Sequence, residues 1–395
     1  MPQRSPNEHA SAGRLRLLFV SHTLPPLKRP LASVGGMQRV AEELYRSFRK
    51  HPRVDVRLLG LRTPWRWIGV RTTGFLARLL ARLPAHARHA DADVVLFSSM
   101  VTAALAPALR RRMPGVRLAA IAHGLDVTLP VGLYQWWLPR VFGALDLVLP
   151  VSSATAEACR RRGAPPERLH ICHNGISVDR FATLVPRDQA RRALEERFGL
   201  PPGAIVVTSV GRQVERKGSA WFVAHVLPAL PAHVHYVIAG DGPSVPEIRA
   251  RAEAAGLAPR VHLTGWVDDA ALNTVLRGAD LFVMPNIPVE GDMEGFGVVL
   301  MEAALSELYA VGARLEGIQD AIAEPHNGVL VPPGDAAAFA EAILRVTGNS
   351  ERLRALGRGA RAYVQETFSW PRSAGRYVDV LTRLARGTPE PLPVP

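Results

Sequence analysis

The chain is organised around the stretch MPNIPVEGDMEGFGVVLME, which runs from Met284 to Glu302. Its first residues end an apolar strand, and the residues from Gly297 onward have the spacing of a helix. Two carboxylates, Glu294 and Glu302, are eight positions apart and enclose a glycine turn. Glycine allows backbone N–H groups to come close to a ligand at the positive end of a helix. The stretch therefore predicts a turn that can hold a sugar and a nucleotide.

Short apolar runs separated by helix-length segments occupy both halves of the chain. The first half begins with LRLLFVSH at 15–22 and ends with LHICHNG at 169–175, and the second runs from AIVVTSVG at 204–211 to GVLVPPG at 328–334. This alternation is typical of βαβ units with a parallel sheet buried on both faces. At 395 residues the chain is also too long for one ordinary core. We predict two doubly wound α/β domains in tandem, whose ligands bind beyond the carboxyl ends of the strands.

Composition narrows the class of protein. Hydrophobic residues make up 48% and charged residues 21% of the chain, as in a soluble enzyme. We find no run of about 18 apolar residues, so no membrane span is predicted. The only cysteines, Cys159 and Cys172, provide no disulfide framework and fit a reducing cytoplasm. The predicted location is therefore cytoplasmic.

The net charge of +13 is unevenly distributed. Residues 1–200 contain 31 basic and 14 acidic residues, which gives +17, and residues 201–395 contain 17 basic and 21 acidic residues, which gives −4. A basic domain is expected to meet phosphates, an anionic lipid surface or nucleic acid. Because no zinc-finger spacing, helix-turn-helix signal or aromatic ribonucleoprotein motif occurs, we predict no nucleic-acid partner.

The loop GRQVERKG follows the first strand of the second half and contains Arg212 and Lys217. An arginine fork and a lysine point charge can neutralise a diphosphate, with charge-assisted hydrogen bonds of about 1.5 to 3 kcal/mol each. The alternative is a solvated basic loop. Neither a G-x-x-x-x-G-K-[ST] loop nor a G-x-G-x-x-G turn follows the first strand of either half. Their absence counts against a P-loop NTPase and a dinucleotide dehydrogenase.

Six motifs together resemble the retaining glycosyltransferases of family 4, which have the GT-B fold. In chain order they are GGMQRV, HNGISVDRF, GRQVERKG, GDGP, HLTGWVDD and EGFGVVLME with its E-x7-E spacing. The family includes bacterial mannosyltransferases and lipopolysaccharide and capsule glycosyltransferases. The resemblance implies two Rossmann-like domains facing across a cleft. The expected parts are a disordered leader at 1–14, an acceptor domain at 15–184, a nucleotide-sugar donor domain at 185–369, a helix at 370–386 that crosses back to the first domain, and a disordered tail at 387–395.

The resemblance also implies roles for individual residues. Arg212 and Lys217 would bind the donor diphosphate, Glu302 would bind the ribose, and Glu294 would hold the transferred sugar together with the backbone of Gly295, Phe296 and Gly297. From the first domain, Gly36 would face the donor phosphate, and His123 would touch the sugar near the reacting carbon. Acceptor contacts would come from Gly35, Met37 and Asp126, although a loop-capping role for Asp126 remains open.

The implied reaction moves a hexose from a nucleotide-diphosphate sugar to an acceptor hydroxyl with retention of anomeric configuration. The resemblance favours front-face attack, in which cations stabilise the leaving diphosphate. GDP-mannose is favoured over a UDP-sugar because the resemblance includes mannosyltransferases. We expect no cofactor and no metal, since two cations would replace the metal. The Asp91-Ala92-Asp93 string precedes a strand rather than ending one and is interpreted as a turn.

The acceptor is expected to be a lipid-linked or polysaccharide hydroxyl. The segment from Leu61 to His89 interleaves tryptophans and leucines with arginines and contains no acidic residue. This composition is typical of a helix that lies on anionic lipid. The alternative is a helix whose leucines face the domain core. We predict peripheral contact with the inner face of the membrane through this segment.

Glu307 and Tyr309 depart from the family pattern at positions where glycine and proline are common. Glycine would supply a left-handed helix cap there, and an acid at a helix C-terminus opposes the helix dipole. The departure puts the geometry beneath the donor site in doubt. It keeps open a non-catalytic nucleotide-sugar-binding partner subunit. A nucleotide-sugar epimerase and a phosphorylase share the fold, but the acid and His set of the former and the pyridoxal-binding lysine of the latter are not evident.

Overall fold

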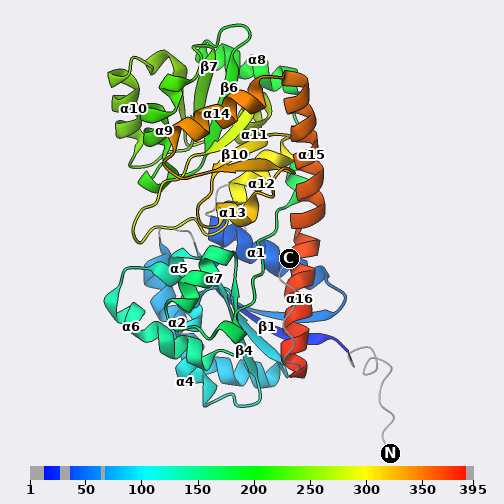
Figure 1. Cartoon of the computed structure of the whole chain (residues 1–395). Helices are drawn as coiled ribbons and strands as arrows, with labels where there is room; N and C mark the ends of the chain where they lie inside the picture. Colours follow the sequence, from blue (N-terminus) through cyan, green and yellow to red (C-terminus); the bar gives the residue numbers. More distant parts are fainter. Residues whose placement is uncertain (1–12, 27–35, 64–66, 388–395) are drawn as a thin grey trace, which may run out of the picture. The chain divides into compact units, whose positions relative to one another are not determined.

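A computed structural model describes residues 13–26, 36–63 and 67–387 (Figure 1). The predicted leader at 1–14 and tail at 387–395 fall almost entirely outside the described residues, as do Gly35 and Trp65. The chain divides into two compact units. Unit 1 extends to Gly175 and also includes the residues from Trp370 onward, and unit 2 is Ile176–Ser369. The boundary predicted from the sequence lies between residues 184 and 185.

Unit 1 is built on a parallel sheet with the strand order β2-β1-β3-β4-β5. Its central strands read as continuous hydrophobic runs because both faces of the sheet are covered; all four residues of β3 are fully buried. Helices α1 and α16 pack against β1. The strands are β1 (Leu15–Leu24), β2 (Val54–Arg62), β3 (Val94–Phe97), β4 (Arg117–Ala122) and β5 (Leu147–Pro150), and the helices are α1 (Gly36–Lys50), α2 (Ile68–His89), α3 (Met100–Ala103), α4 (Ala106–Arg110), α5 (Leu125–Thr128), α6 (Gly132–Ala144), α7 (Ser153–Arg160) and α16 (Trp370–Arg386).

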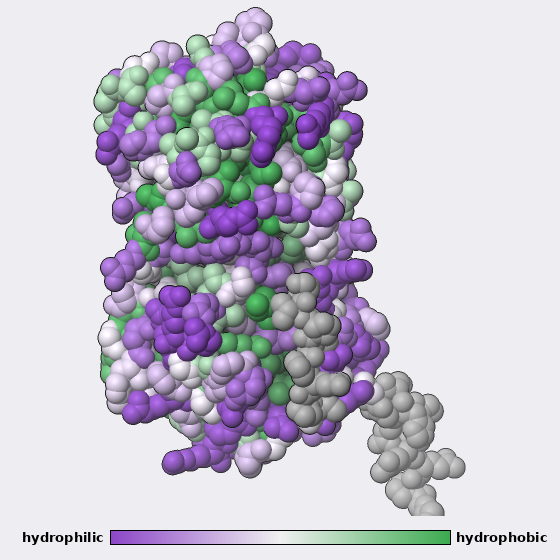
Figure 2. Space-filling model, viewed as in Figure 1, coloured by the Kyte–Doolittle hydropathy of each residue, from purple (hydrophilic) through white to green (hydrophobic). Residues whose placement is uncertain are grey.

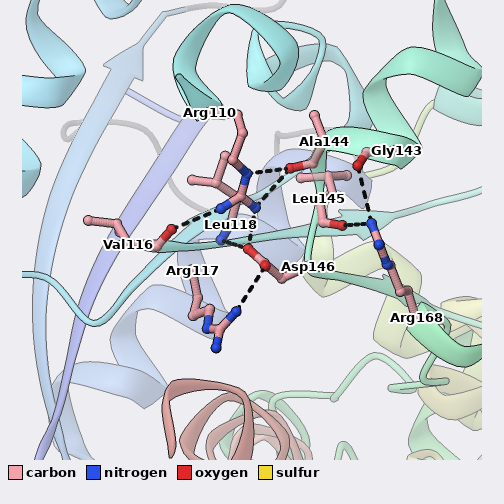
Figure 3. A network of polar contacts seen from close by, with 9 residues as sticks. All are labelled: Arg110, Val116, Arg117, Leu118, Gly143, Ala144, Leu145, Asp146 and Arg168. Atoms are coloured by element: carbon pink, nitrogen blue, oxygen red, sulfur yellow. Dashed lines mark hydrogen bonds and ion pairs between the residues drawn. The ribbon is translucent and has the colours of Figure 1, made fainter. Parts of the chain in front are cut away.

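Part of the positive charge of unit 1 is used inside the fold, at the amino ends of β4 and β5 (Figure 3). Arg110 donates to the carbonyl of Ala144 at 2.9 Å and to that of Val116 at 3.3 Å, and it forms an ion pair with Asp146. The same Asp146 carboxylate accepts from Arg117 at 3.3 Å. These arginines satisfy backbone carbonyls and a half-buried acid. The basic excess of the first half is therefore partly structural and only partly available to a ligand or a surface.

Unit 2 contains a second parallel sheet, with the strand order β11-β10-β9-β6-β7-β8. Helix α8 packs against α11, α9 against α10, and α12 against α15. The strands are β6 (Ile205–Val210), β7 (Val234–Ala239), β8 (Val261–Gly265), β9 (Leu281–Met284), β10 (Tyr309–Ala313) and β11 (Gly328–Val331), and the helices are α8 (Arg187–Phe198), α9 (Ser219–His225), α10 (Val245–Ala254), α11 (Asp269–Gly278), α12 (Val298–Leu305), α13 (Ile318–Ala321), α14 (Ala336–Thr347) and α15 (Ser350–Phe368). Short 3-10 helices include η4 (Val178–Phe181) and η5 (Glu215–Lys217).

Helix α12 ends in a regular cap in which Glu307 replaces glycine. Glu307 has a φ of +62°, in the left-handed region. Its N–H donates to the Ala304 carbonyl at 2.9 Å, and the Leu308 N–H donates to the Ala303 carbonyl at 3.0 Å. This pair of bonds is the Schellman pattern. Arg277 donates to the Glu307 carboxylate at 2.6 Å and so compensates an acid at the negative end of the helix.

Tyr309, the second departure from the family pattern, begins β10 and is buried. Its hydroxyl lies 2.9 Å from the Pro325 carbonyl and 3.0 Å from the Gly328 carbonyl, and its one proton is shared between them. The bulky side chain thus fills the space beside β11 and finds a backbone partner there. The departures at Glu307 and Tyr309 leave the helix that carries Glu302 intact.

The left-handed conformation of Glu307 gives a first prediction. Glu307→Gly and Glu307→Ala both remove the ion pair with Arg277, but only alanine keeps the steric cost of a positive φ. We expect the glycine variant to be more stable than the alanine variant by about 1 kcal/mol in urea denaturation. Equal free energies of unfolding for the two variants would contradict a left-handed cap at residue 307.

Candidate active site

The switch point of unit 2 lies between β6 and β9. From β6 the chain proceeds outward to β7 and β8, whereas β9, β10 and β11 lie on the other side. In open parallel sheets the loops that follow two such strands diverge and leave a crevice for a ligand at the carboxyl edge. The loop after β6 carries Arg212 and Lys217, and the loop after β9 carries Glu294. Both predicted groups therefore lie at the position where this architecture binds ligands.

A cluster of opposite charges joins the two loops. One oxygen of Glu294, Oε2, accepts from Lys217 Nζ at 2.5 Å and from Arg216 Nη1 at 2.5 Å. Arg216 also donates to Asp292 at 2.8 Å. The side chains of Lys217, Glu294 and Arg216 are only 14%, 13% and 19% exposed. Charge-assisted bonds of this kind are strong when they are partly desolvated, so the cluster fixes the positions of both loops.

The charges of this cluster set the pKa of Glu294. Burial by itself raises the pKa of the carboxyl, but the charges of Lys217 and Arg216 outweigh burial and lower it to about 2. The carboxylate of Glu316 accepts a hydrogen bond from the Glu294 N–H at 2.5 Å. Burial raises the pKa of Glu316. Glu294 is therefore a carboxylate at all physiological pH values and acts as a hydrogen-bond acceptor.

The structure joins Lys217 to Arg216, not to Arg212, around this carboxylate. Arg212 is exposed, and its guanidinium forms no hydrogen bond or ion pair within the described residues. Arg216 was missed by the sequence analysis, although it precedes Lys217 in GRQVERKG. Its role depends on Asp292 and Glu294, which are 76 and 78 positions away along the chain. Arg212 remains available to an incoming anion.

The turn between the two carboxylates is held by close backbone contacts. Gly297 has a φ of +75° and precedes α12. Gly317 donates its N–H to the Glu294 carbonyl at 3.1 Å, and a Cβ at Gly317 would lie 2.2 Å from the carbonyl oxygen of Gly295. Phe296 is 3% exposed and packs against Phe368. Only the backbone of the predicted Gly295, Phe296 and Gly297 set can therefore face a ligand at this turn.

Glu302 lies in the second turn of α12, between apolar neighbours, with a side chain that is 7% exposed. Its Oε1 accepts from Arg180 Nη1 at 3.1 Å, and Arg180 Nη2 donates to Asp269 at 2.9 Å. Arg180 comes from η4, and Asp269 begins α11. Glu302 was predicted from the sequence, whereas its partner Arg180 and the second acid, Asp269, were not.

Asn286 is a further polar residue that the sequence analysis missed. It follows β9 and is 1% exposed, and neither polar atom of its amide has a hydrogen-bond partner among the described residues. It lines a cavity of about 10 Å³ together with Lys217, Gln213 and Ser219. A polar space of this size can hold one water molecule, which would satisfy the amide next to the lysine.

In unit 1, two histidines lie at the carboxyl edge of the sheet. His123 follows β4, and its Nε2 donates to the Ser98 carbonyl at 2.9 Å, which fixes the ring. His22, near the end of β1, is buried, and its Nδ1 lies 3.4 Å from the Ser99 hydroxyl. Burial and the neighbouring His123 lower the pKa of His22 to about 4. His123 was predicted from the sequence and His22 was not, although His22 is the last residue of the predicted strand at 15–22.

The remaining predicted residues of unit 1 have varied positions. Asp126 is 4% exposed, and its carboxylate accepts from the N–H groups of His123 at 2.8 Å and Met100 at 2.9 Å. This is the geometry of a loop cap, the second of the two roles left open. Gly36 is exposed and begins α1, and Met37 follows it half-buried. Gly35 lies outside the described residues.

Within 13–26, 36–63 and 67–387, no group of three or more His, Cys, Asp or Glu could hold a metal ion. The Asp91-Ala92-Asp93 string lies just before β3, where Asp93 accepts from the Arg16 N–H at 2.9 Å. Both cysteines are buried, and burial raises the pKa of the Cys172 thiol to about 12. Asp93 therefore serves as a partner of the β1 backbone, and both thiols are shielded from solvent.

Two family models match the chain. The model described as Glycosyltransferase Family 4 matches residues 34–180, and the one described as Glycosyl transferases group 1 matches residues 204–349. The chain is 32% identical over 282 residues to a D-inositol 3-phosphate glycosyltransferase of Xylanimonas cellulosilytica. The matched region covers 70% of this chain and 66% of that protein, which is just under two thirds of its length. It is 30% identical over 301 residues to a GDP-mannose-dependent alpha-(1-6)-phosphatidylinositol monomannoside mannosyltransferase of Mycobacterium tuberculosis, with 74% of this chain and 76% of that protein covered.

Solved structures agree in fold. The Anabaena protein HepE in complex with UDP superposes with a TM-score of 0.72 at 19% identity, over 93% of this chain and 99% of that one. The catalytic domain of starch synthase IV from Arabidopsis thaliana, bound to ADP and acarbose, superposes with a TM-score of 0.72 at 16% identity, over 94% and 100%. Together with the two parallel-sheet units, this likeness confirms the predicted GT-B fold.

Proposed function

Because the chain belongs to family 4 of the glycosyltransferases, we propose that it transfers a hexose from a nucleotide-diphosphate sugar to an acceptor hydroxyl with retention of configuration. GDP-mannose is the favoured donor, since a relative at 30% identity is a GDP-mannose-dependent mannosyltransferase. A UDP-sugar is the second candidate, because HepE, which has the same fold, binds UDP. The observation that carries the proposal is the Lys217–Glu294–Arg216 cluster at the switch point of unit 2.

Charge balance in the cluster supports a role for Arg212 in donor binding. Arg216 and Lys217 are balanced by Glu294 and Asp292, so the cluster itself brings no net positive charge. Arg212, which is exposed and not paired with any described residue, adds the missing cation for a diphosphate. Lys217 would stay beside Glu294 and donate another of its ammonium protons to the phosphate. Glu294 would then accept hydrogen bonds from the sugar hydroxyls, and the backbone of Gly295, Phe296 and Gly297 would complete the donor site.

The proposed step is a front-face displacement. The bond between the anomeric carbon and the diphosphate oxygen breaks, and the acceptor oxygen bonds to the same face of that carbon. The acceptor proton passes to the departing phosphate oxygen, which serves as the base. Arg212 and Lys217 would stabilise the negative charge that grows on the leaving group, as preorganised electrostatic stabilisation. His123 would touch the sugar near the reacting carbon. We propose that the reaction needs no metal and no cofactor.

We further propose a lipid-linked or polysaccharide acceptor and a cytoplasmic enzyme that contacts the inner face of the membrane. No helix within the described ranges 13–26, 36–63 and 67–387 is long and apolar enough to cross a membrane. Leu79 and Leu83 of α2 are buried, as the alternative interpretation expected, whereas Trp67 and Val70 at its start are 50% and 77% exposed. Gly35, Met37 and Asp126 remain the proposed acceptor contacts, although the loop-capping bonds of Asp126 favour support of the loop.

Exposed apolar side chains among the described residues are concentrated in unit 1. Hydrophilic residues cover much of the surface on the face shown in Figure 2, with hydrophobic residues between them. Leu133 and Trp136 at the start of α6 are 75% and 59% exposed, and Arg140 stacks 4.0 Å from the ring of Trp136. Apolar and cationic side chains together favour an anionic lipid interface. The exposed large hydrophobic residues of unit 1 are Trp67, Val70, Leu125, Leu129, Val131, Leu133 and Trp136.

A sedimentation experiment tests the membrane contact. The wild-type protein is expected to sediment with phosphatidylglycerol vesicles at low salt and to be released by high salt, because screening weakens the attraction. Leu133→Asp with Trp136→Asp should lower the bound fraction severalfold, and so should Trp67→Asp with Val70→Asp. Leu344→Asp, at an exposed leucine of unit 2, is the matched control and should bind as the wild type does. A wild type that stays in the supernatant at low salt would refute the contact.

Nucleotide release tests the function itself. The protein is incubated with GDP-mannose, UDP-glucose and ADP-glucose, with and without a lipid-linked acceptor, and the released nucleotide and the anomer of the product are followed by NMR. An α-linked product from an α-linked donor is expected, with release unaffected by EDTA. Binding without release would favour the partner subunit, and epimerised nucleotide sugar would favour the epimerase. If no donor is bound, the proposal fails.

A further inference from the structure

Arg180 occupies a position that the proposed reaction does not yet explain. Its guanidinium is 18% exposed and bridges two carboxylates, Glu302 at 3.1 Å and Asp269 at 2.9 Å. The three residues come from η4, α12 and α11, and all belong to unit 2. A planar guanidinium can hold two acids in fixed directions, which a lysine cannot do. The bridge therefore ties three separate elements together at one carboxylate of the predicted donor site.

Glu302 depends on this bridge because of its surroundings. Its neighbours on α12, Met301 and Ala303, are fully buried, and the Glu302 side chain is itself 7% exposed. A carboxylate in such a place is costly unless a cation compensates it. Arg180 supplies that cation through Oε1. The bond also selects one orientation of the carboxylate, since a charge-assisted hydrogen bond is directional.

We propose that Arg180 is a positioning residue for the nucleotide ribose, acting through Glu302. This inference rests on the proposed function, in which Glu302 accepts hydrogen bonds from the ribose hydroxyls of the donor. Arg180 holds the Glu302 carboxylate turned so that it can accept both hydroxyls of the diol. Asp269, at the start of α11, holds the other side of the guanidinium and keeps it from following Glu302 toward the ligand.

The test compares nucleotides with and without the ribose diol. Calorimetry measures the affinity of GDP and of 2′,3′-dideoxy-GDP, with UDP and 2′,3′-dideoxy-UDP in parallel. Arg180→Ala is expected to weaken binding of the hydroxylated nucleotide ~10-fold, as the loss of one oriented charge-assisted contact would. Its affinity for the dideoxy nucleotide should stay within about twofold of the wild type. In turnover, the KM for the donor should rise ~10-fold with kcat unchanged, which is the signature of lost uniform binding.

Matched variants separate positioning from folding. Arg180→Lys should recover part of the affinity, because an ammonium can pair with Glu302 but cannot hold Asp269 in the same plane. Arg187→Ala removes an arginine that pairs with Asp280 at 2.8 Å elsewhere in unit 2, and it should bind GDP as the wild type does. Asp269→Asn should weaken the binding of GDP less than Arg180→Ala does.

The outcomes distinguish this inference from the proposed function. Equal weakening of hydroxylated and dideoxy nucleotides by Arg180→Ala would assign Arg180 a general structural role and overturn the inference. Unchanged affinity for GDP and UDP in Arg180→Ala would overturn it as well, with the proposed function intact. A wild type that binds none of the nucleotides would overturn the proposed function and this inference together.

Discussion

Replacement of Lys217 by alanine is expected to lower kcat for transfer from the nucleotide sugar by about 10³-fold, because removal of one preorganised group that stabilises developing charge costs on the order of 10² to 10³ in kcat. The ammonium is 14% exposed and 2.5 Å from Glu294, so it is already fixed before a donor binds. Little of the loss should appear in KM, since the charge on the diphosphate oxygen grows as the bond breaks. Steady-state kinetics with a saturating acceptor measures both constants.

Controls for Lys217→Ala use residues of the same loop and unit. Lys217→Met keeps the length of the side chain and should lose as much activity as alanine, because charge is the quantity that matters. Arg192→Ala removes an exposed arginine of α8 that pairs with Asp188 at 2.8 Å, and it should be fully active. Lys217→Ala should stay folded, because Arg216 still pairs with Glu294 at 2.5 Å, and it should cost less stability than the loss of the Glu294 charge, which affects both pairs. A Lys217→Ala enzyme within tenfold of wild-type kcat would refute the assignment.

The strands were predictable from the sequence because their signal is local. Val94–Phe97 and Leu281–Met284 are continuous apolar runs, and a parallel sheet covered on both faces requires such runs. The glycine turn and the helix that carries Glu302 were predictable for the same reason. The sequence also predicted which strand ends carry polar residues. It therefore identified the edge of the sheet at which Lys217 and Glu294 meet.

The partners of these residues could not be predicted, because they depend on strand order. Arg216 and Glu294 are 78 positions apart, and Arg180 and Glu302 are 122 apart. They meet because β6 and β9 are neighbours in the sheet, and because Arg180 of η4 reaches Glu302 of α12. An exposed loop arginine and a buried, bridging arginine have the same local pattern. Sequence reasoning therefore selected Arg212 from GRQVERKG, while the geometry adds Arg216.

Helix capping shows a different limit of prediction. A glutamate at the position usually taken by glycine predicted a disturbed helix end. The structure compensates for it through Arg277, which is 30 positions away and donates to the Glu307 carboxylate. The local rule about left-handed caps still holds, since Glu307 adopts a φ of +62°. The favourable ion pair offsets the steric cost of that conformation.

Substitution of Glu294 by glutamine should destabilise unit 2 by about 3 kcal/mol at pH 7, because the carboxyl pKa falls from 4.5 in the unfolded chain to about 2 in the fold. The side chain is only 13% exposed, so solvent screens the pairs with Lys217 and Arg216 weakly. Glutamine keeps the shape of the side chain and leaves both cations without its negative charge. Hydrogen exchange of the β6 and β9 amides reports the free energy of unfolding of this unit.

The pH dependence of the same pair of proteins provides the sharper test. A carboxyl whose folded pKa is depressed contributes its full stability above the unfolded value of 4.5, and that contribution disappears as the pH falls toward 2. The difference in stability between the wild type and Glu294→Gln should therefore be constant from pH 8 to about 5 and shrink toward zero near pH 2. Glu253→Gln, at an exposed acid of α10, should show no comparable difference. A difference that does not change with pH would mean that Glu294 contributes by shape and hydrogen bonding, and that its charge is not what joins the two loops.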